Sequence, residues 1–163
     1  LSEQQLEWLQ EFSEAAALPQ KSLLTRYRLL DTLATKLSSI KERVEEDLET
    51  KSPLEKYAEI DAGLREKWED ELVAAVEAEY RRQRGEMLAA LQWWLRDVWL
   101  RTLGSSTDLL HLPELAGADA VARRITPTQA LENLRIMEQT QRLLHLNVQE
   151  SLTLEVGLIK LHL

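Results

Sequence analysis

The sequence predicts an all-α fold, and two observations support this. Only five of its 163 residues are glycine and four are proline, while Leu, Ala, Glu, Gln, Lys and Arg, which favour helices, dominate. Apolar residues also recur every three or four positions along most of the chain, the spacing of one helix face. We therefore expect a helical bundle with almost no sheet.

The first half of the chain carries the signals of two helices. Ser2 followed three residues later by Gln5 is a capping-box pattern, which predicts a helix over Glu3 to Ala17 that Pro19 ends. A long amphipathic helix should follow, since one apolar stripe recurs at helical spacing. The stripe consists of Leu23, Tyr27, Leu30, Leu33, Leu37, Ile40, Val44 and Leu48.

The middle of the chain continues in helix. A second capping signal consists of Ser52, Pro53 and Glu55. Apolar positions follow at Leu54, Tyr57, Ile60, Leu64, Trp68, Leu72 and Val76, and later from Met87 to Trp99. Gly63 and Gly85 each cost a helix about 1 kcal/mol relative to Ala, so we expect a break near one of them and two helices rather than one.

The last third begins with a loop. Gly104, with Ser105 and Ser106 after it, predicts a helix end, and a short helix is expected from Glu114 to about Arg124. Thr126, Pro127 and Gln129 repeat the capping signature and open a helix to about Leu146. We expect residues 1–85 to form a helical segment and 86–163 a second helical domain, although the two can also pack as one domain.

The closing segment alternates apolar and polar residues like a strand, but a strand there would lack a partner. As a helix it has two apolar stripes on nearly opposite sides. One contains Leu152, Val156, Ile159 and Leu163, and the other Leu154, Leu158 and Leu161. One stripe can pack on the chain's own bundle, and the second needs either further helices of the same domain or another subunit.

The distribution of charge argues against a nucleic-acid-binding surface. The formal charge is −8, and residues 41–80, with 14 acids and 6 bases, account for it, so DNA contact is not expected. Acidic runs such as 45–47 and 69–71 are interpreted as solvated helix faces. Arg81, Arg82, Arg84, Arg123 and Arg124 are interpreted as solvated or salt-bridged.

No catalytic residue, cofactor site or metal site is predicted. The chain has no cysteine, which excludes disulfides and thiolate chemistry, and no glycine-rich phosphate loop. Its three histidines lack a Glu-x-x-His partner, and the only near spacing, Asp108 to His111, falls in an expected loop. The chain starts at Leu1 and shows no signal peptide or apolar span, so we expect a fragment of a soluble, cytoplasmic protein.

Five tryptophans are present, and three lie close together. Trp94 shares a helix face with Leu91, Leu95 and Val98, whereas Trp93 projects about 100° away from it. An association surface or a wide ordinary core would each explain this surplus of aromatic residues.

The second half of the chain contains the three blocks LQWWLRDVWLRTLG (91–104), ITPTQALENLRIMEQTQRLLHLNV (125–148) and SLTLEVGLIKL (151–161). In this order they resemble the C-terminal domain of the delta prime subunit of the bacterial DNA polymerase III clamp loader. The residues that carry the resemblance are Trp94, Leu95, Arg96, Asp97, Gly104, Leu131, Asn147, Val148, Leu152, Leu154, Glu155, Leu158 and Leu161. Gln149 and Glu150 depart from the Asn and Pro usual in that family, and the acidic stretch 41–80 is longer.

The resemblance implies an all-helical collar domain that joins gamma/tau-type and delta subunits in a five-membered ring. The ATPase modules would precede Leu1, so this piece would contribute assembly rather than hydrolysis to a DNA polymerase III holoenzyme. Together with the two stripes, it predicts a subunit interface containing Trp93, Leu154, Leu158 and Leu161. The alternatives are the collar domain of a gamma/tau-type motor subunit, or an unrelated helical adaptor or coiled-coil scaffold that associates through the stripe from Leu23 to Leu48.

Overall fold

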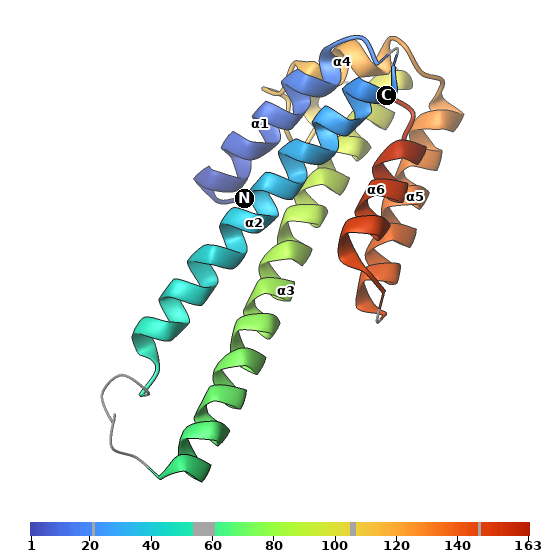
Figure 1. Ribbon diagram of the computed structural model, residues 1–163. Coiled ribbons are helices and arrows are strands. Elements are labelled where there is room, and N and C mark those ends of the chain that lie inside the picture. Colours follow the sequence, from blue (N-terminus) through green and yellow to red (C-terminus); the bar gives the residue numbers. More distant parts are fainter. Residues whose placement is uncertain (21, 54–60, 105–106, 147) are drawn as a thin grey trace. The chain divides into compact units, whose positions relative to one another are not determined.

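The structure is a computed structural model that describes the whole chain except residues 21, 54–60, 105–106 and 147 (Figure 1). Helices are the only regular secondary structure of the described residues, which confirms the predicted fold class. They are α1 (Glu3–Ala17), α2 (Leu23–Lys51), α3 (Ala62–Thr102), the 3₁₀ turn η1 (Thr107–Leu109), α4 (Gly117–Ala122), α5 (Pro127–His145) and α6 (Glu150–Lys160). None of the helices in these residues is both long and apolar enough to cross a membrane.

The chain divides into two compact units. Residues 1–34 and 87–163 form the first unit, and residues 35–86 form the second. The division within α3 lies next to the expected boundary, but residues 1–34 belong with the C-terminal part. The reason is that α1 packs against α4, and the indole N–H of Trp94 on α3 donates to Ser13 Oγ on α1 at 3.0 Å.

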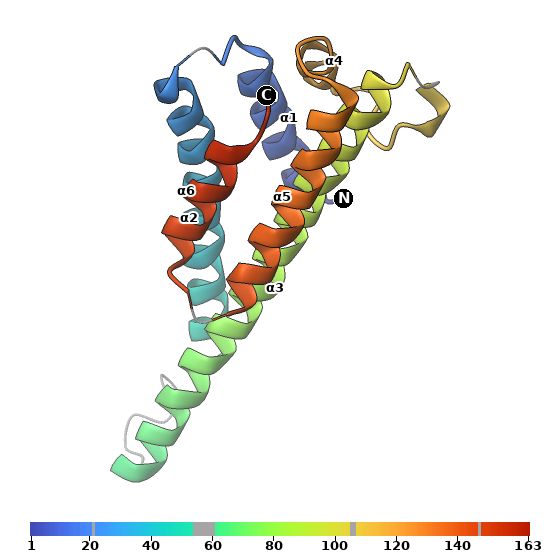
Figure 2. The ribbon, with the colours of Figure 1, turned by 90° about the vertical axis from the view of Figure 1, so that its right-hand side faces the viewer.

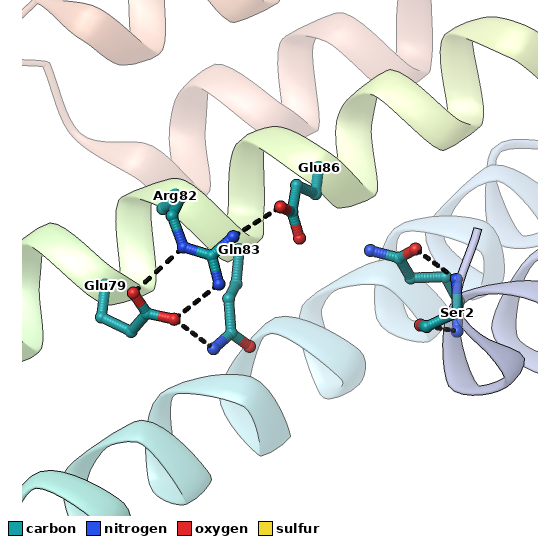
Figure 3. A network of polar contacts seen from close by, with 6 residues as sticks. Ser2, Glu79, Arg82, Gln83 and Glu86 are labelled. Atoms are coloured by element: carbon teal, nitrogen blue, oxygen red, sulfur yellow. Dashed lines mark hydrogen bonds and ion pairs between the residues drawn. The ribbon is translucent and has the colours of Figure 1, made fainter.

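Helix α1 begins and ends with side-chain caps. Ser2 Oγ accepts from the Gln5 N–H, and Gln5 Oε1 accepts from the Ser2 N–H at 2.9 Å, which confirms the capping box (Figure 3). At the other end, Arg124 donates to the carbonyls of Ala16 at 2.6 Å and Leu18 at 2.9 Å. These bonds satisfy carbonyls that have no partner within the helix.

The core of the first unit is built around Trp94, which is fully buried. The ring of Phe12 lies edge-on to it, with centroids 5.7 Å apart and planes at 86°. Trp94 thus joins the core as its helical spacing predicted. Other buried side chains of this unit include Leu9, Leu29, Leu33, Leu91, Leu95, Val98, Val121 and Met137.

Helix α3 is continuous through Gly85, so the break considered there is wrong. The cost of one glycine is small against more than 40 residues of helix, and no side chain or backbone crowds the position. Near Gly63, the helix begins one residue earlier, at Ala62. Leu54, Glu55, Tyr57 and Ile60 lie outside the described residues, and Glu55 is one of the three residues of the second capping signal.

The segment after α3 is held by Asp97. Gly104 ends the helix with φ = 70°, as predicted, while Ser105 and Ser106 lie outside the described residues. The buried Asp97 carboxylate accepts from the backbone N–H groups of His111 at 2.9 Å and Leu112 at 2.6 Å. The short helix then starts at Gly117 rather than Glu114, because isolated turns bring Leu112 and Leu115 into the core first.

The second unit contains 35–51 of α2 and 62–86 of α3. Leu37, Ile40, Val44 and Tyr80 are buried, and Lys41 Nζ lies 5.9 Å from the centroid of the Tyr80 ring. Most acidic side chains of 41–80 are exposed, in agreement with their interpretation as a solvated face.

Arg82 in the second unit bridges two carboxylates (Figure 3). It donates to Glu79 at 2.7 and 3.0 Å and to Glu86 at 2.5 Å, and Gln83 Nε2 donates to Glu79 at 2.9 Å. The hydrogen bond from Arg82, followed by that from Gln83, lowers the pKa of Glu79 from 4.5 to about 2.

Candidate functional site

Helices α5 and α6 pack side by side as an antiparallel pair (Figures 1 and 2). Helix α5 opens with the predicted capping box of Thr126 and Gln129, which confirms its start. Its Thr140 faces Gly157 of α6, where an added Cβ would lie less than 3.0 Å from Thr140 Oγ1. Gly157 therefore allows a close approach of the two helices that a larger residue would prevent.

The two apolar stripes of α6 differ sharply in burial. Leu154, Leu158 and Leu161 are 4%, 3% and 2% exposed, whereas Leu152, Val156 and Ile159 are 54%, 42% and 38% exposed. This corrects the sequence-based choice of interface residues, because Leu154, Leu158 and Leu161 belong to the chain's own core. The side that is free is formed by Leu152, Val156 and Ile159, which we call the exposed stripe.

Two residues of α2 hold α6 from one side. Arg26 donates to the carbonyl of Leu158 at 3.2 Å and also to that of Leu161. Burial, and then the charge of Arg124, lower the pKa of Arg26 from its ordinary value. The Tyr27 hydroxyl donates to Glu155 at 2.7 Å, and this bond raises the pKa of Tyr27. These contacts turn the Leu154–Leu158 side of α6 inward.

The chain end is held by α5. Asn133 Nδ2 donates to the His162 carbonyl, and the His162 N–H donates to Asn133 Oδ1, both at 2.7 Å. The His162 ring lies 3.0 Å from Glu132. Helical periodicity would place Leu163 on the same side as the exposed stripe. It is buried instead, because α6 ends at Lys160 and the last residues no longer follow the helix.

An open groove runs between α5 and α6, and we call it the α5/α6 groove. Apolar side chains from both helices line it, and Thr140 and Gly157 lie where the helices come closest. The apolar residues are Leu131, Ile136 and Leu143 of α5 and Leu152 and Val156 of α6. An apolar groove between two helices is the kind of surface that receives a third helix.

The charged side chains at this groove are not all paired. Glu132 lies 3.0 Å from His162. Arg135 and Lys160, both exposed, form no hydrogen bond or ion pair with any residue that the structure describes. Two cations that have no partner in the described part of the chain therefore border the apolar groove.

Trp93 lies at a second groove, between α3 and α5. It is 42% exposed, its ring stacks on His111 with centroids 4.3 Å apart, and the Arg96 guanidinium lies 5.4 Å from it. Leu131 and Arg135 line this second groove as well as the first. Of the four predicted interface residues, Trp93 is thus the one that lies at the surface. The groove that it lines adjoins the α5/α6 groove.

The other sequence candidates are structural. Arg81, Arg82 and Arg123 pair with acids on their own helices, as interpreted from the sequence. Arg124 caps α1, and Arg84 is buried with its guanidinium 5.7 Å from the Tyr80 ring. Within the described residues no three His, Asp or Glu side chains gather in a way that could hold a metal ion.

Arg135, Lys160, Ile136 and Leu143 did not stand out in the sequence. They matter only because of the side of α5 that the last helix covers. The spacing of residues along the chain does not show which side this is. No protein-family model, no curated protein and no solved structure matches this chain. The functional interpretation depends on the groove and on the sequence blocks.

Proposed function

We propose that this chain is an oligomerisation domain of a clamp loader, equivalent to the collar domain of the delta prime subunit. The observation that carries the proposal is the exposed stripe of α6 beside the α5/α6 groove. Leu152 and Val156 lie on a helix whose other side is firmly packed, so exposure there is not a sign of a loose terminus. Contiguous apolar surface of this kind marks protein interfaces.

The three sequence blocks support the specific assembly. Some residues that carry the resemblance also have defined structural roles, since Asp97 fixes the segment after α3 and Leu154 and Leu158 anchor α6. Leu152 belongs to the same block as Leu154 and Leu158 but has no such role within the chain, so it would be available to contact the partner subunit. The proposed partners are gamma/tau-type and delta subunits in the cytoplasm, and the proposed contribution is assembly of the complex that loads the sliding clamp, not catalysis.

Burial argues against a scaffold that associates through the stripe of the second helix. Leu33, Leu37, Ile40 and Val44 in the middle of that stripe are buried within this chain, whereas Leu23 and Tyr27 at its start are exposed. A stripe whose middle is covered by the chain's own residues offers little to a coiled-coil partner. The exposed stripe of α6, by contrast, is not covered by the rest of the chain.

Size-exclusion chromatography with light scattering tests the proposal. The chain is run alone and mixed with the collar domain of a clamp-loader motor subunit from the same source. We expect a defined complex that Val156→Asp abolishes, because a carboxylate would be desolvated within the interface. Circular dichroism should show the variant folded, since an exposed substitution changes stability by only about 0.5 kcal/mol.

Val73→Asp is the matched control, because Val73 is exposed on α3 in the second unit and lies outside the proposed interface. It should leave the complex intact. Leu158→Asp should unfold the chain, since it buries a carboxylate in the core. A homodimer that ignores the motor subunit would refute the proposal, as would a complex that Val156→Asp leaves intact.

A further inference from the structure

We propose that the occupant of the α5/α6 groove is an amphipathic helix with acidic flanks, contributed by a different protein and not by a second copy of this chain. The inference rests on the proposed function in one respect, since it takes the groove to be an assembly surface. It adds the chemistry of the partner that the groove selects.

The shape of the groove favours a helix. It runs between two helices that pack antiparallel, and Gly157 against Thr140 brings them close at one point. Leu131 and Leu152, on opposite helices, both line it. A helix laid along such a groove inserts a ridge of apolar side chains spaced three and four residues apart.

The charges at the groove favour acids on that helix. Glu132 lies within 3.0 Å of His162, and Glu138, which lines the adjoining groove, pairs with Arg142 at 2.8 Å. Arg135 and Lys160 are the cations left without a partner among the described residues. Carboxylates on both flanks of the incoming stripe would complete these two pairs, and a basic helix would be repelled.

A second copy of this chain is disfavoured as the occupant by charge. Its net charge of −8 opposes self-association. Its acidic segment, 41–80, buries Val44 and Tyr80 but exposes Leu64 and Val73, so the charge and not a lack of apolar surface argues against it. We therefore assign the acidic helix to a different protein.

The test uses two fluorescent helical peptides with the same leucine stripe, one flanked by Glu and the other by Lys. Fluorescence anisotropy measures the binding of each to the full chain over a range of salt concentrations. We expect the acidic peptide to bind roughly tenfold more tightly at low salt, a preference that added salt reduces. The double variant Arg135→Glu/Lys160→Glu should reverse the preference.

Lys67→Glu is the matched control, because Lys67 is exposed in the second unit and has no partner among the described residues. It should leave the preference unchanged. Equal binding of both peptides, or a preference that survives the double variant, would overturn the inference. So would a concentration-dependent dimer of the unmixed chain that Val156→Asp dissolves.

The peptide result and the motor-subunit result are separable. If the acidic peptide binds in the groove but the chain ignores clamp-loader subunits, the charge inference stands and the clamp-loader proposal falls. If the chain joins those subunits with no effect of Arg135→Glu/Lys160→Glu, the proposed function stands and the charge inference falls.

Discussion

Gly157 is the residue on which the packing of α5 against α6 depends most directly. We predict that Gly157→Ala lowers the free energy of unfolding by about 1–3 kcal/mol, because the new methyl group would overlap Thr140. Urea denaturation followed by circular dichroism measures this. The loss should occur although alanine is the better helix former.

Gly85 provides the opposite case within a helix. A Cβ there would meet nothing within 4 Å, so Gly85→Ala should raise the free energy of unfolding by about 1 kcal/mol through helix propensity alone. The same denaturation experiment compares the two variants. If both alanines stabilise the chain, the close approach at Gly157 does not limit the packing.

Glu79 gives the second unit a measurable pH dependence. Its pKa is lowered from 4.5 to about 2 by the hydrogen bonds of Arg82 and Gln83. Because the pKa is lower in the folded chain, the ionised carboxylate stabilises the fold at pH values above the unfolded-state pKa of 4.5. This stabilisation is lost as the pH falls through about 2. The carboxyl ¹³C shift of Glu79, followed by NMR, should therefore titrate well below 4.5, and Arg82→Gln should move its midpoint upward. A midpoint near 4.5 in the unmodified chain would contradict the network.

At the scale of elements, the end of α6 depends on Asn133 of α5. We predict that Asn133→Ala raises the rate of amide exchange at His162 and lowers the free energy of unfolding by about 1–3 kcal/mol, since it removes two hydrogen bonds to the His162 backbone. Hydrogen exchange followed by NMR measures both. Unchanged exchange at His162 would mean that Arg26 and the buried leucines hold the chain end without it.

Several element ends could be predicted to the residue because their signals are local. Ser2 with Gln5, and Thr126 with Gln129, satisfy backbone groups within one turn, so each box fixes its helix start without help from the rest of the chain. Gly104 fixes a helix end in the same way. The start of the short helix at Gly117 was missed because it depends on Leu112 and Leu115 reaching the core, which is a tertiary effect.

The candidate site could be predicted only in part. The two stripes of α6 followed from helical periodicity, but both are equally apolar, so spacing alone did not say which one is buried. A signal was present in Gly157, which lies beside Leu154 and Leu158 around the helix and marks the side of close approach. The two cations at the groove, Arg135 and Lys160, could not be recognised, because only the packed helices show that they have no partner among the residues that the structure describes.

At the scale of the whole molecule, charge is unevenly distributed along the chain. The acidic stretch 41–80 lies in the second unit, whereas the α5/α6 groove, the groove at Trp93 and the exposed stripe belong to the first. The first unit carries the proposed association surface, and the net negative charge of the second unit opposes association with another copy of the chain. This division is what the proposed heteromeric assembly requires.

Methyl NMR of the chain, alone and bound to a motor-subunit collar domain, tests the central claim most directly. We predict that the methyl groups of Leu152, Val156 and Ile159 shift or gain contacts to the partner, while those of Leu154 and Leu158 keep their core environment. The experiment compares the two stripes within a single helix. A complex in which the exposed stripe is unperturbed would contradict the account.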